Sequence, residues 1–445
     1  MENVKRNIPE IKTAGKVLII AFCFPPMPVI GSQRPYGLAK YLPQFGWKPF
    51  VLTVNHKGDF PPNIQVQATE YVDRLALVKK IAGFNSATGV HQQIGIPVAK
   101  NFKYASLKSK TIKAIREIIA FPDEEIGWLS RAVNSASELI SRIKFDAMIS
   151  TSFPVTTHLI ARRLKRKYGI PWIADFRDLW TQNHYYGKFG PIGYLERRME
   201  QKTMSSADAL VTISEPLADE LKSLHCRKEV QCITNGYDPE DFQTAPAALS
   251  EKFSITYTGR LYNGKRDPSL LFKAVAELVG KKILDRSRIE INFYGPEEQW
   301  LSTDIEEYGL KGIVNVCGNI SRDSALKIQQ QSQLLLLLLW DEEKEKGVYT
   351  GKLFEYLGSR RPIVAVGGGN SIVKDLLAGT SAGSFAENQN QIEEIITRHY
   401  RNYLNDGSVK FEGNNSITDY SYSSIAQKYS DLLNSVISAQ PMGRN

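Results

Sequence analysis

The sequence has few of the residues that build metal centres or disulfides. Its 445 residues include six histidines and four cysteines. These are spread along the chain without C-x-x-C or H-E-x-x-H spacing. We therefore expect no metal site made of protein ligands, and we expect the thiols to be reduced. The cysteines are Cys23, Cys226, Cys232 and Cys317.

Apolar runs of membrane-spanning length are also lacking. The run Leu334–Trp340 has seven residues, which suits a buried strand and is too short to cross a bilayer. The chain has no apolar stretch ahead of Val17, so a secretory signal is not expected. These features predict an intracellular, cytoplasmic protein.

Positive charge is in excess, but only in one half. Residues 1–245 carry 33 lysines and arginines against 23 carboxylates, whereas residues 246–445 carry 23 against 24. The net charge of +9 therefore comes from the first half. With 42% hydrophobic and 23% charged residues, the composition is that of a globular protein.

Two domains are expected, because 445 residues exceed the size of one hydrophobic core. Each half opens with an apolar strand, near 17–22 and 254–258, that runs into a loop with glycine and cations. Apolar strands then alternate with helical patterns, which predicts parallel sheets covered on both faces. Further strands are expected near 49–54, 147–151, 171–175, 209–213, 230–233, 289–294, 313–317, 334–339, 362–366 and 382–385. The predicted fold is α/β with two doubly wound Rossmann-like domains, in residues 1–240 and 241–418, and a helix in 419–445 that packs back on the first domain.

One segment, residues 351–359, has a pattern typical of diphosphate binding. Gly351 and Lys352 open a predicted helix, whose free N–H groups and dipole attract anions. Glu355 follows one turn later and can accept hydrogen bonds from sugar hydroxyls. The alternative is an ordinary surface helix with a weak pair between Lys352 and Glu355.

Further candidates follow the predicted strands, where parallel sheets bind ligands. In the first half, Asp175 and Asp178 flank Arg177, an arrangement that is costly unless the charges are paired or used. The alternative is an internal brace of Arg177 with one aspartate. The other candidates at strand ends are Gly31, Arg34, Ser152, Gly259, Arg260, Lys265 and Asn319.

These motifs together resemble the GT-B fold glycosyltransferases, and among them the retaining enzymes of family 4. The resemblance covers nearly the whole chain. It is carried by Phe24-Pro-Pro with Gly31, the D-F-R-D-x-W segment Asp175–Trp180, Ile233-Thr-Asn-Gly-Tyr-Asp238, Tyr257-Thr-Gly-Arg260 with Lys265, Phe293-Tyr-Gly295 and Gly351–Leu357.

The resemblance implies a role for several of these residues. Arg260 and Lys265 would neutralise the donor diphosphate, and Glu355 would bind the ribose. The loop at Asn319 would hold the base. Gly31 would approach the donor from the opposite domain, across a cleft between the two. We accordingly predict Arg260, Lys265 and Asp175 as catalytic, Gly31, Gly259, Asn319, Gly351, Lys352 and Glu355 as donor-binding, and Arg34, Ser152, Arg177 and Asp178 as acceptor or cleft residues.

The chain departs from the family pattern at two places. A glutamate commonly stands eight residues before Glu355, where this chain has Gly347, and Glu343 or Glu345 could replace it. A histidine often follows the strand at 147–151, but here His158 comes later, inside a predicted helix, and is expected to be structural.

The resemblance implies transfer of a sugar from a nucleoside-diphosphate sugar to a glycan or lipid-linked acceptor, with retention, in polysaccharide or glycoconjugate synthesis. No cofactor or metal is expected, because cationic side chains neutralise the diphosphate. The alternatives are another nucleotide-sugar enzyme of this fold, such as an epimerase, or a non-catalytic binder of nucleotide sugars or polyanions. Nucleic acid is not expected as a partner, since no motif for it is present.

Two basic segments in the first half raise the hypothesis of an anionic membrane surface as a partner, which would make the protein peripheral on the inner face of the membrane. Lys100–Phe121 has isoleucines on one helical side and cations on the other, and Arg162–Lys167 holds five cations in six residues. The alternative is that each is an amphipathic helix with a solvated charged face.

Overall fold

The computed structural model of the protein describes residues 15–74, 119–183, 190–242, 248–340, 347–368 and 371–439. The described residues form two compact units. The first unit extends to Thr234 and resumes at Ile425, and the second unit comprises Asn235–Ser424. The chain therefore passes between the units twice, and the second passage lies within one helix, α14 (Tyr422–Ser438).

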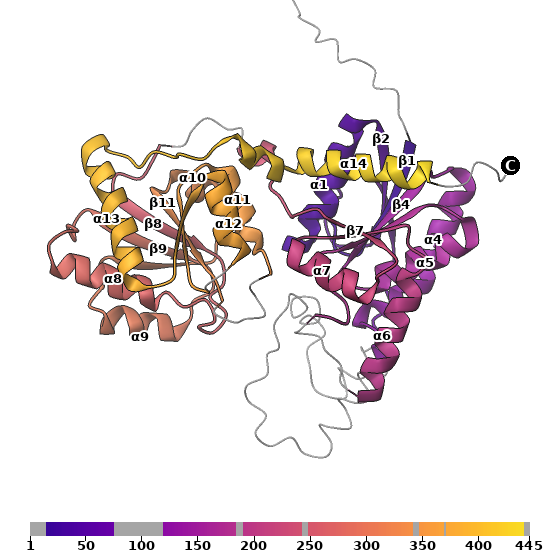
Figure 1. The fold of residues 1–445 in the computed structure, drawn as a ribbon, viewed down its shortest axis with the longest axis horizontal. Helices are drawn as coiled ribbons and strands as arrows, with labels where there is room; N and C mark the ends of the chain where they lie inside the picture. The colour runs from indigo at the N-terminus through magenta and orange to yellow at the C-terminus, as the bar shows by residue number, and fades with distance from the viewer. Residues whose placement is uncertain are drawn as a thin grey trace, which may run out of the picture. The chain divides into compact units, whose positions relative to one another are not determined.

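The first unit is built on a parallel sheet of seven strands in the order β3-β2-β1-β4-β5-β6-β7 (Figure 1). The order reverses between β1 and β4, which is where doubly wound sheets bind ligands. The strands are β1 (Gly15–Ala21), β2 (Trp47–Val54), β3 (Gln65–Thr69), β4 (Ala147–Ser152), β5 (Trp172–Phe176), β6 (Ala209–Thr212) and β7 (Glu229–Cys232).

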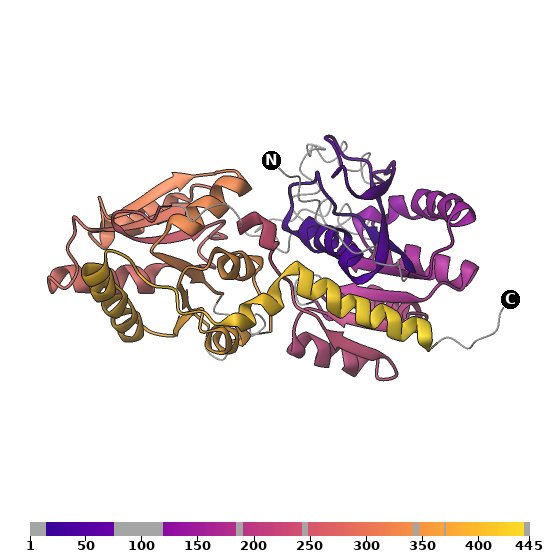
Figure 2. The same cartoon turned by 90° about the horizontal axis from the view of Figure 1, so that it is seen from above.

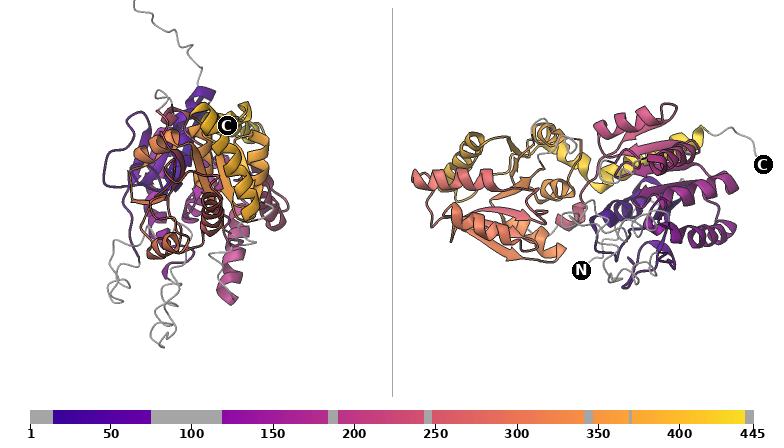
Figure 3. Two further views of the ribbon diagram at one scale, coloured as in Figure 1. Left: turned by 90° about the vertical axis from the view of Figure 1, so that its left-hand side faces the viewer. Right: turned by 90° about the horizontal axis from the view of Figure 1, so that it is seen from below.

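Helices of the first unit begin at residues that suit a helix start. At α7, for example, the Ser214 side chain accepts a hydrogen bond from the N–H of Leu217, and Pro216 lies in the first turn. The helix α6 extends away from the sheet (Figure 3), whereas α14 lies along the unit (Figure 2) and buries Tyr429 and Leu433. The helices are α1 (Gln33–Tyr41), α4 (Leu129–Arg142), α5 (Thr156–Tyr168), α6 (Gly190–Met204), α7 (Glu215–Leu224) and the end of α14.

The second unit has a parallel sheet of six strands in the order β10-β9-β8-β11-β12-β13, which reverses between β8 and β11. The strands are β8 (Phe253–Thr258), β9 (Ile289–Tyr294), β10 (Val314–Gly318), β11 (Leu334–Leu338), β12 (Ile363–Val366) and β13 (Gly383–Ala386). The helices are α8 (Ser269–Gly280), α9 (Gln299–Glu307), α10 (Arg322–Gln331), α11 (Gly351–Ser359), α12 (Ile372–Thr380) and α13 (Gln389–Asp406).

Strand β11 is buried on both faces, which explains why all its residues are leucine. Leu334, Leu336 and Leu338 pack into a core with α8 and α13, whereas Leu335 and Leu337 pack into a second core with α11 and α12. Successive side chains of a strand point to opposite faces, so a strand covered on both sides must be apolar throughout.

The predicted fold class is confirmed, and every strand expected from the sequence is present. Strand β3 was not predicted, because its sequence Gln-Val-Gln-Ala-Thr has no apolar run. It lies at the edge of the sheet, where half-exposed residues suffice. Among the described helices, none is both long and apolar enough to cross a membrane.

Candidate functional site

The strongest candidate site lies in the second unit, where β8 and β11 end side by side. Lys352, in the first turn of α11, donates a hydrogen bond from Nζ to Tyr257 Oη at 2.6 Å. Its ammonium also lies 4.0 Å from the centre of the Tyr257 ring. Burial and the nearby Arg266 hold the pKa of Lys352 well below its usual range. A buried cation of this kind gains from an anionic ligand.

Gly259 is required beside Lys352 for two reasons. Its φ of +118° is a conformation that side chains rarely adopt, and a Cβ atom there would collide with Cε and Nζ of Lys352. Gly259 thus leaves the lysine room to reach the end of β8. The structure brings together the predicted donor residues Gly259, Gly351 and Lys352.

Arg266 is part of this cluster and was not predicted. Its Nη1 lies 3.4 Å from Tyr257 Oη, and its Nη2 donates to Thr350 Oγ1 at 3.3 Å. Its Nε is buried without a hydrogen-bond partner among the described residues. The adjacent Lys265 is the cation that the family resemblance predicts, and no motif in the sequence points to Arg266.

The other two predicted cations of this loop are placed differently. Lys265 lies over the Trp340 ring, with Nζ 4.5 Å from the ring centre. Arg260 is exposed, and it is its carbonyl oxygen that accepts a hydrogen bond from Tyr257 Oη at 2.6 Å. Contact of either side chain with a donor stays a prediction.

Glu355 lies on the same helix as Lys352 and is held by a second cluster. Arg322 Nε is 3.5 Å from a Glu355 oxygen, and Arg322 Nη2 donates to Asp241 at 2.7 Å. Burial raises the pKa of Glu355, while Arg322 and Gln329 oppose the rise. Arg322 and Asp241 are 81 positions apart, and no motif or periodicity predicts their pairing.

Asn319 lies just beyond β10, at the sheet edge, and is exposed. Backbone hydrogen bonds join the loops there, since Gly295 N–H donates to Gly318 O and Gly259 N–H donates to Tyr294 O. Gly347 follows the segment 341–346, so the candidates Glu343 and Glu345 lie outside the described residues, as do residues 100–118 of the basic segment Lys100–Phe121.

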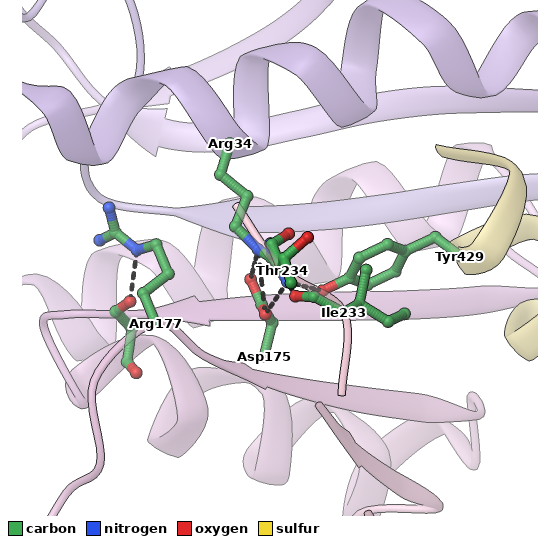
Figure 4. Close-up of polar contacts among 7 residues, drawn as sticks. Arg34, Asp175, Arg177, Ile233, Thr234 and Tyr429 are labelled. Atoms are coloured by element: carbon green, nitrogen blue, oxygen red, sulfur yellow. Dashed lines mark hydrogen bonds and ion pairs between the residues drawn. The ribbon is translucent and has the colours of Figure 1, made fainter. Parts of the chain in front are cut away.

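In the first unit, the structure pairs Asp175 with Arg34 in the interior (Figure 4). Arg34 Nη2 is 2.9 Å from Asp175 Oδ1, and the two side chains are 1% and 0% exposed. Arg34 also donates to the carbonyls of Ile233 and Thr234 and to Tyr429 Oη. Burial alone would raise the pKa of Asp175, but Arg34 holds it below its ordinary value. These contacts are those of positioning residues, and direct contact of Asp175 with a substrate stays a prediction.

Arg177 braces the neighbouring loops rather than pairing with Asp175. Its guanidinium donates to the carbonyls of Gly31 at 2.5 Å, Ser152 at 2.5 Å and Phe153 at 2.8 Å. The loops after β1, β4 and β5 are thereby joined at the point where the strand order reverses. Asp178 is exposed beside this brace.

His158 lies inside α5 and is fully buried, as expected for a structural residue. Its Nδ1 is 2.7 Å from Ser150 Oγ, which in turn accepts a hydrogen bond from Trp172 Nε1 at 2.8 Å. The hydroxyl can accept from the indole and still either donate to or accept from Nδ1, while Nε2 is buried without a hydrogen-bond partner among the described residues. Burial lowers the pKa of His158 to about 3.

Comparison with known proteins identifies the first unit. Residues 33–241 match the profile of Glycosyltransferase Family 4. This match covers slightly less than half of the chain and makes residues 33–241 similar to that family. No curated protein sequence matches this chain.

Solved glycosyltransferase structures share the fold of the whole chain. Sucrose-phosphate synthase of Thermosynechococcus elongatus is 11% identical with a TM-score of 0.60, over 96% of this chain and 100% of the other. A glycosyltransferase of Rickettsia africae is 13% identical with a TM-score of 0.59, over 96% and 99%. HepE of Anabaena, solved with UDP and glucose, is 12% identical with a TM-score of 0.56, over 95% and 100%. The chain has the GT-B fold of these glycosyltransferases.

Proposed function

We propose that this glycosyltransferase moves a sugar from a nucleoside-diphosphate sugar to a glycan or lipid-linked acceptor with retention, in surface polysaccharide or glycoconjugate synthesis. The observation that carries the proposal is the meeting of Lys352 and Arg266 on Tyr257 Oη, at the start of α11. Among the described residues, no carboxylate forms an ion pair with either cation. A diphosphate would supply the missing negative charge. The UDP and glucose bound to the GT-B relative HepE support a nucleotide-sugar donor.

The chemistry follows from where charge develops. As the bond between sugar and diphosphate breaks, negative charge grows on the leaving oxygen, and Lys352, Arg266 and the N-terminal N–H groups of α11 stabilise it. The same oxygen then takes the proton of the acceptor hydroxyl, whose oxygen bonds to the anomeric carbon on the face that the diphosphate leaves, so that retention needs no enzyme base. In other enzymes a metal ion neutralises the leaving diphosphate, whereas here the cationic side chains do so. Activity should therefore persist in EDTA.

The donor site is tested by calorimetry with UDP, GDP and ADP in EDTA. Lys352→Met and Arg266→Met should each weaken binding of the preferred nucleotide about 10- to 100-fold, because each removes a charge-assisted hydrogen bond. Lys374→Met is the control, since Lys374, on α12, is half-exposed and pairs with Glu387, which follows β13. Binding that is unchanged in both site variants would refute this placement of the diphosphate.

We propose that Glu355 accepts hydrogen bonds from the ribose hydroxyls, with Arg322 holding its carboxylate in place. The wild type should then bind a nucleoside diphosphate more tightly than its 2′-deoxy form. Glu355→Ala should lose most of this preference. In the Glu355→Ala background, Lys352→Met should still weaken nucleotide binding. A preference that survives the substitution would assign the ribose to other residues.

We also propose that the first unit contacts an anionic membrane that carries the acceptor. Arg163, Arg166 and Lys167 are exposed on α5. On α6, Tyr194 and Leu195 are 58% and 60% exposed, beside exposed arginines. Apolar and cationic side chains together suit the interface of an anionic bilayer.

Vesicle flotation tests the membrane partner. The protein should float with vesicles of phosphatidylcholine and phosphatidylglycerol at low salt and should stay in solution with phosphatidylcholine alone. Replacing both Tyr194 and Leu195 with serine should reduce flotation. If flotation is absent or insensitive to salt, the membrane is not a partner of this surface.

A further inference from the structure

Gln329, on α10, is a buried polar residue beside the proposed donor site. It is 0% exposed, and its Nε2 donates a hydrogen bond to Thr258 Oγ1 at 3.0 Å. Its side chain also hydrogen-bonds with the Glu355 side chain. Since an ionised carboxylate can only accept, Nε2 is the donor in this contact too, and both of its hydrogens are used. The amide of Gln329 therefore joins Glu355, on α11, to the end of β8.

The other polar atom of this amide has no use within the fold. Oε1 of Gln329 is buried without a hydrogen-bond partner among the described residues. A buried acceptor that is left unpaired costs free energy. An apolar side chain of similar size would avoid this cost, so the glutamine is best explained by what its two N–H groups hold.

Thr258 is itself fixed close to the proposed diphosphate site. It is the last residue of β8, and its backbone N–H donates to Tyr356 Oη at 3.1 Å. The next residue is Gly259, which lies against Lys352. Through Gln329, the carboxylate of Glu355 is tied to the strand end that also borders Lys352.

The charges around Glu355 determine how much of it is ionised. The ionisable groups that act on its carboxylate are Arg322, Asp241, Lys352 and the neighbouring Tyr356. Burial is the main cause that raises the pKa of Glu355, whereas Arg322, Gln329 and Lys352 lower it. Without the amide of Gln329, the carboxylate would lose a donor and take up a proton more readily.

We infer that Gln329 is a positioning residue, which orients Glu355 toward the ribose hydroxyls and so sets the preference of the site for ribose over deoxyribose. The inference rests on the proposed function, because it takes the ligand of Glu355 to be the ribose of a nucleotide-sugar donor. No motif in the sequence points to Gln329.

Calorimetry tests the inference with the nucleoside diphosphate that the wild type binds best and with its 2′-deoxy form. Gln329→Leu and Gln329→Met should each lower the ratio of the two affinities about 3- to 10-fold, as expected for one hydrogen bond. Affinity for the 2′-deoxy form should stay the same. Gln330→Leu is the control, since Gln330 is the next residue of α10 and is only half-buried, and it should keep the ratio. Thermal unfolding checks that each variant is folded.

The pH dependence of the same ratio separates positioning from a structural role. Both ligands carry the same diphosphate, so titration of the phosphates and of Lys352 cancels in the ratio. The preference for ribose needs an ionised Glu355, and it should be lost as pH falls through the pKa of this carboxyl. In Gln329→Leu this loss should occur at a higher pH than in the wild type, because a donor that lowers the pKa is missing.

Equal losses of affinity for both nucleotides would show a purely structural role and overturn the inference. A ratio and a pH profile that match the wild type in both Gln329 variants would also overturn it, while the donor site at Lys352 and Glu355 would stand. If the wild type binds no nucleoside diphosphate, the proposed function fails and the inference fails with it.

Discussion

At the scale of single residues, Arg34 is a buried cation in the first unit and needs a protein partner for its charge. A guanidinium that is 1% exposed has lost its water, and it is satisfied instead by Asp175, Tyr429 and the carbonyls of Ile233 and Thr234. The chain leaves the first unit at Thr234 and re-enters it at α14. Arg34 therefore contacts both the segment that leaves the unit and, through Tyr429, the helix that returns to it. We expect its contribution to appear in stability before it appears in catalysis.

The substitution Asp175→Asn tests this. It leaves a buried charge uncompensated and should lower the free energy of unfolding by about 3–5 kcal/mol. Asp219→Asn is the control, because its pair with Lys222 is exposed at 74% and 47%, and such pairs contribute about 0–1 kcal/mol. Urea unfolding measures both. Equal losses in the two variants would contradict the assigned role of the Arg34–Asp175 pair.

His158 should make stability depend on pH. Its pKa is about 3 in the folded protein and 6.5 in an unfolded chain, so the unfolded chain binds the extra proton between these values. Stability should therefore fall as pH drops below 6.5, by about 2 kcal/mol by about pH 5 from this residue alone. The variant His158→Gln should show a shallower dependence in urea unfolding at several pH values. The same slope in both proteins would contradict a neutral buried His158.

At the scale of elements, the loop after β8 depends on two glycines with different surroundings. Gly259 has φ of +118° and touches Lys352, whereas Gly264 has φ of +82° with nothing within 4 Å of an added Cβ atom. Gly259→Ala should therefore displace Lys352 and weaken nucleotide binding about 10-fold or more, beyond the backbone strain that Gly264→Ala shares. Calorimetry on the two variants measures the difference. Equal affinities would show that Gly259 does not make room for Lys352.

Elements were predictable from the sequence where local pattern decides them. The run Leu334–Leu338 reads as a buried strand and Gly351-Lys352 reads as the start of a helix, because both signals lie within a few residues, and both elements are present. Arg266 was not predicted, because its contacts with Tyr257 and Thr350 follow a left-handed turn at Tyr262 and Asn263 that no motif reports. In that turn, the Tyr262 ring packs edge-on against Trp340, which is 78 positions later in the sequence.

Contacts between distant segments were the part that sequence reasoning could not reach. Arg34 and Asp175 were both selected, but as cleft and catalytic residues, and their pairing across 141 positions was not foreseen. The contact of Arg34 with Tyr429 spans 395 positions. No periodicity or motif reports such pairs, which follow only from the sheet order and the return of α14.

At the scale of the whole molecule, each unit has its own sheet and its own cores. The family 4 match at 33–241 lies mainly in the first unit, whereas the cluster of Lys352, Arg266 and Tyr257 lies in the second. We accordingly propose that the second unit binds the donor and that the first unit binds the acceptor. The central claim is that the cations of the second unit drive departure of the diphosphate.

Proton NMR of nucleotide-sugar consumption in EDTA tests that claim most directly. Wild-type protein should slowly transfer one of the UDP-, GDP- or ADP-sugars to water, and the sugar released first should keep the anomeric configuration of the donor. Lys352→Met and Arg266→Met should each slow this reaction about 100-fold, since each removes stabilisation of the leaving diphosphate. Equal rates in wild type and both variants, or a first product of inverted configuration, would contradict the account.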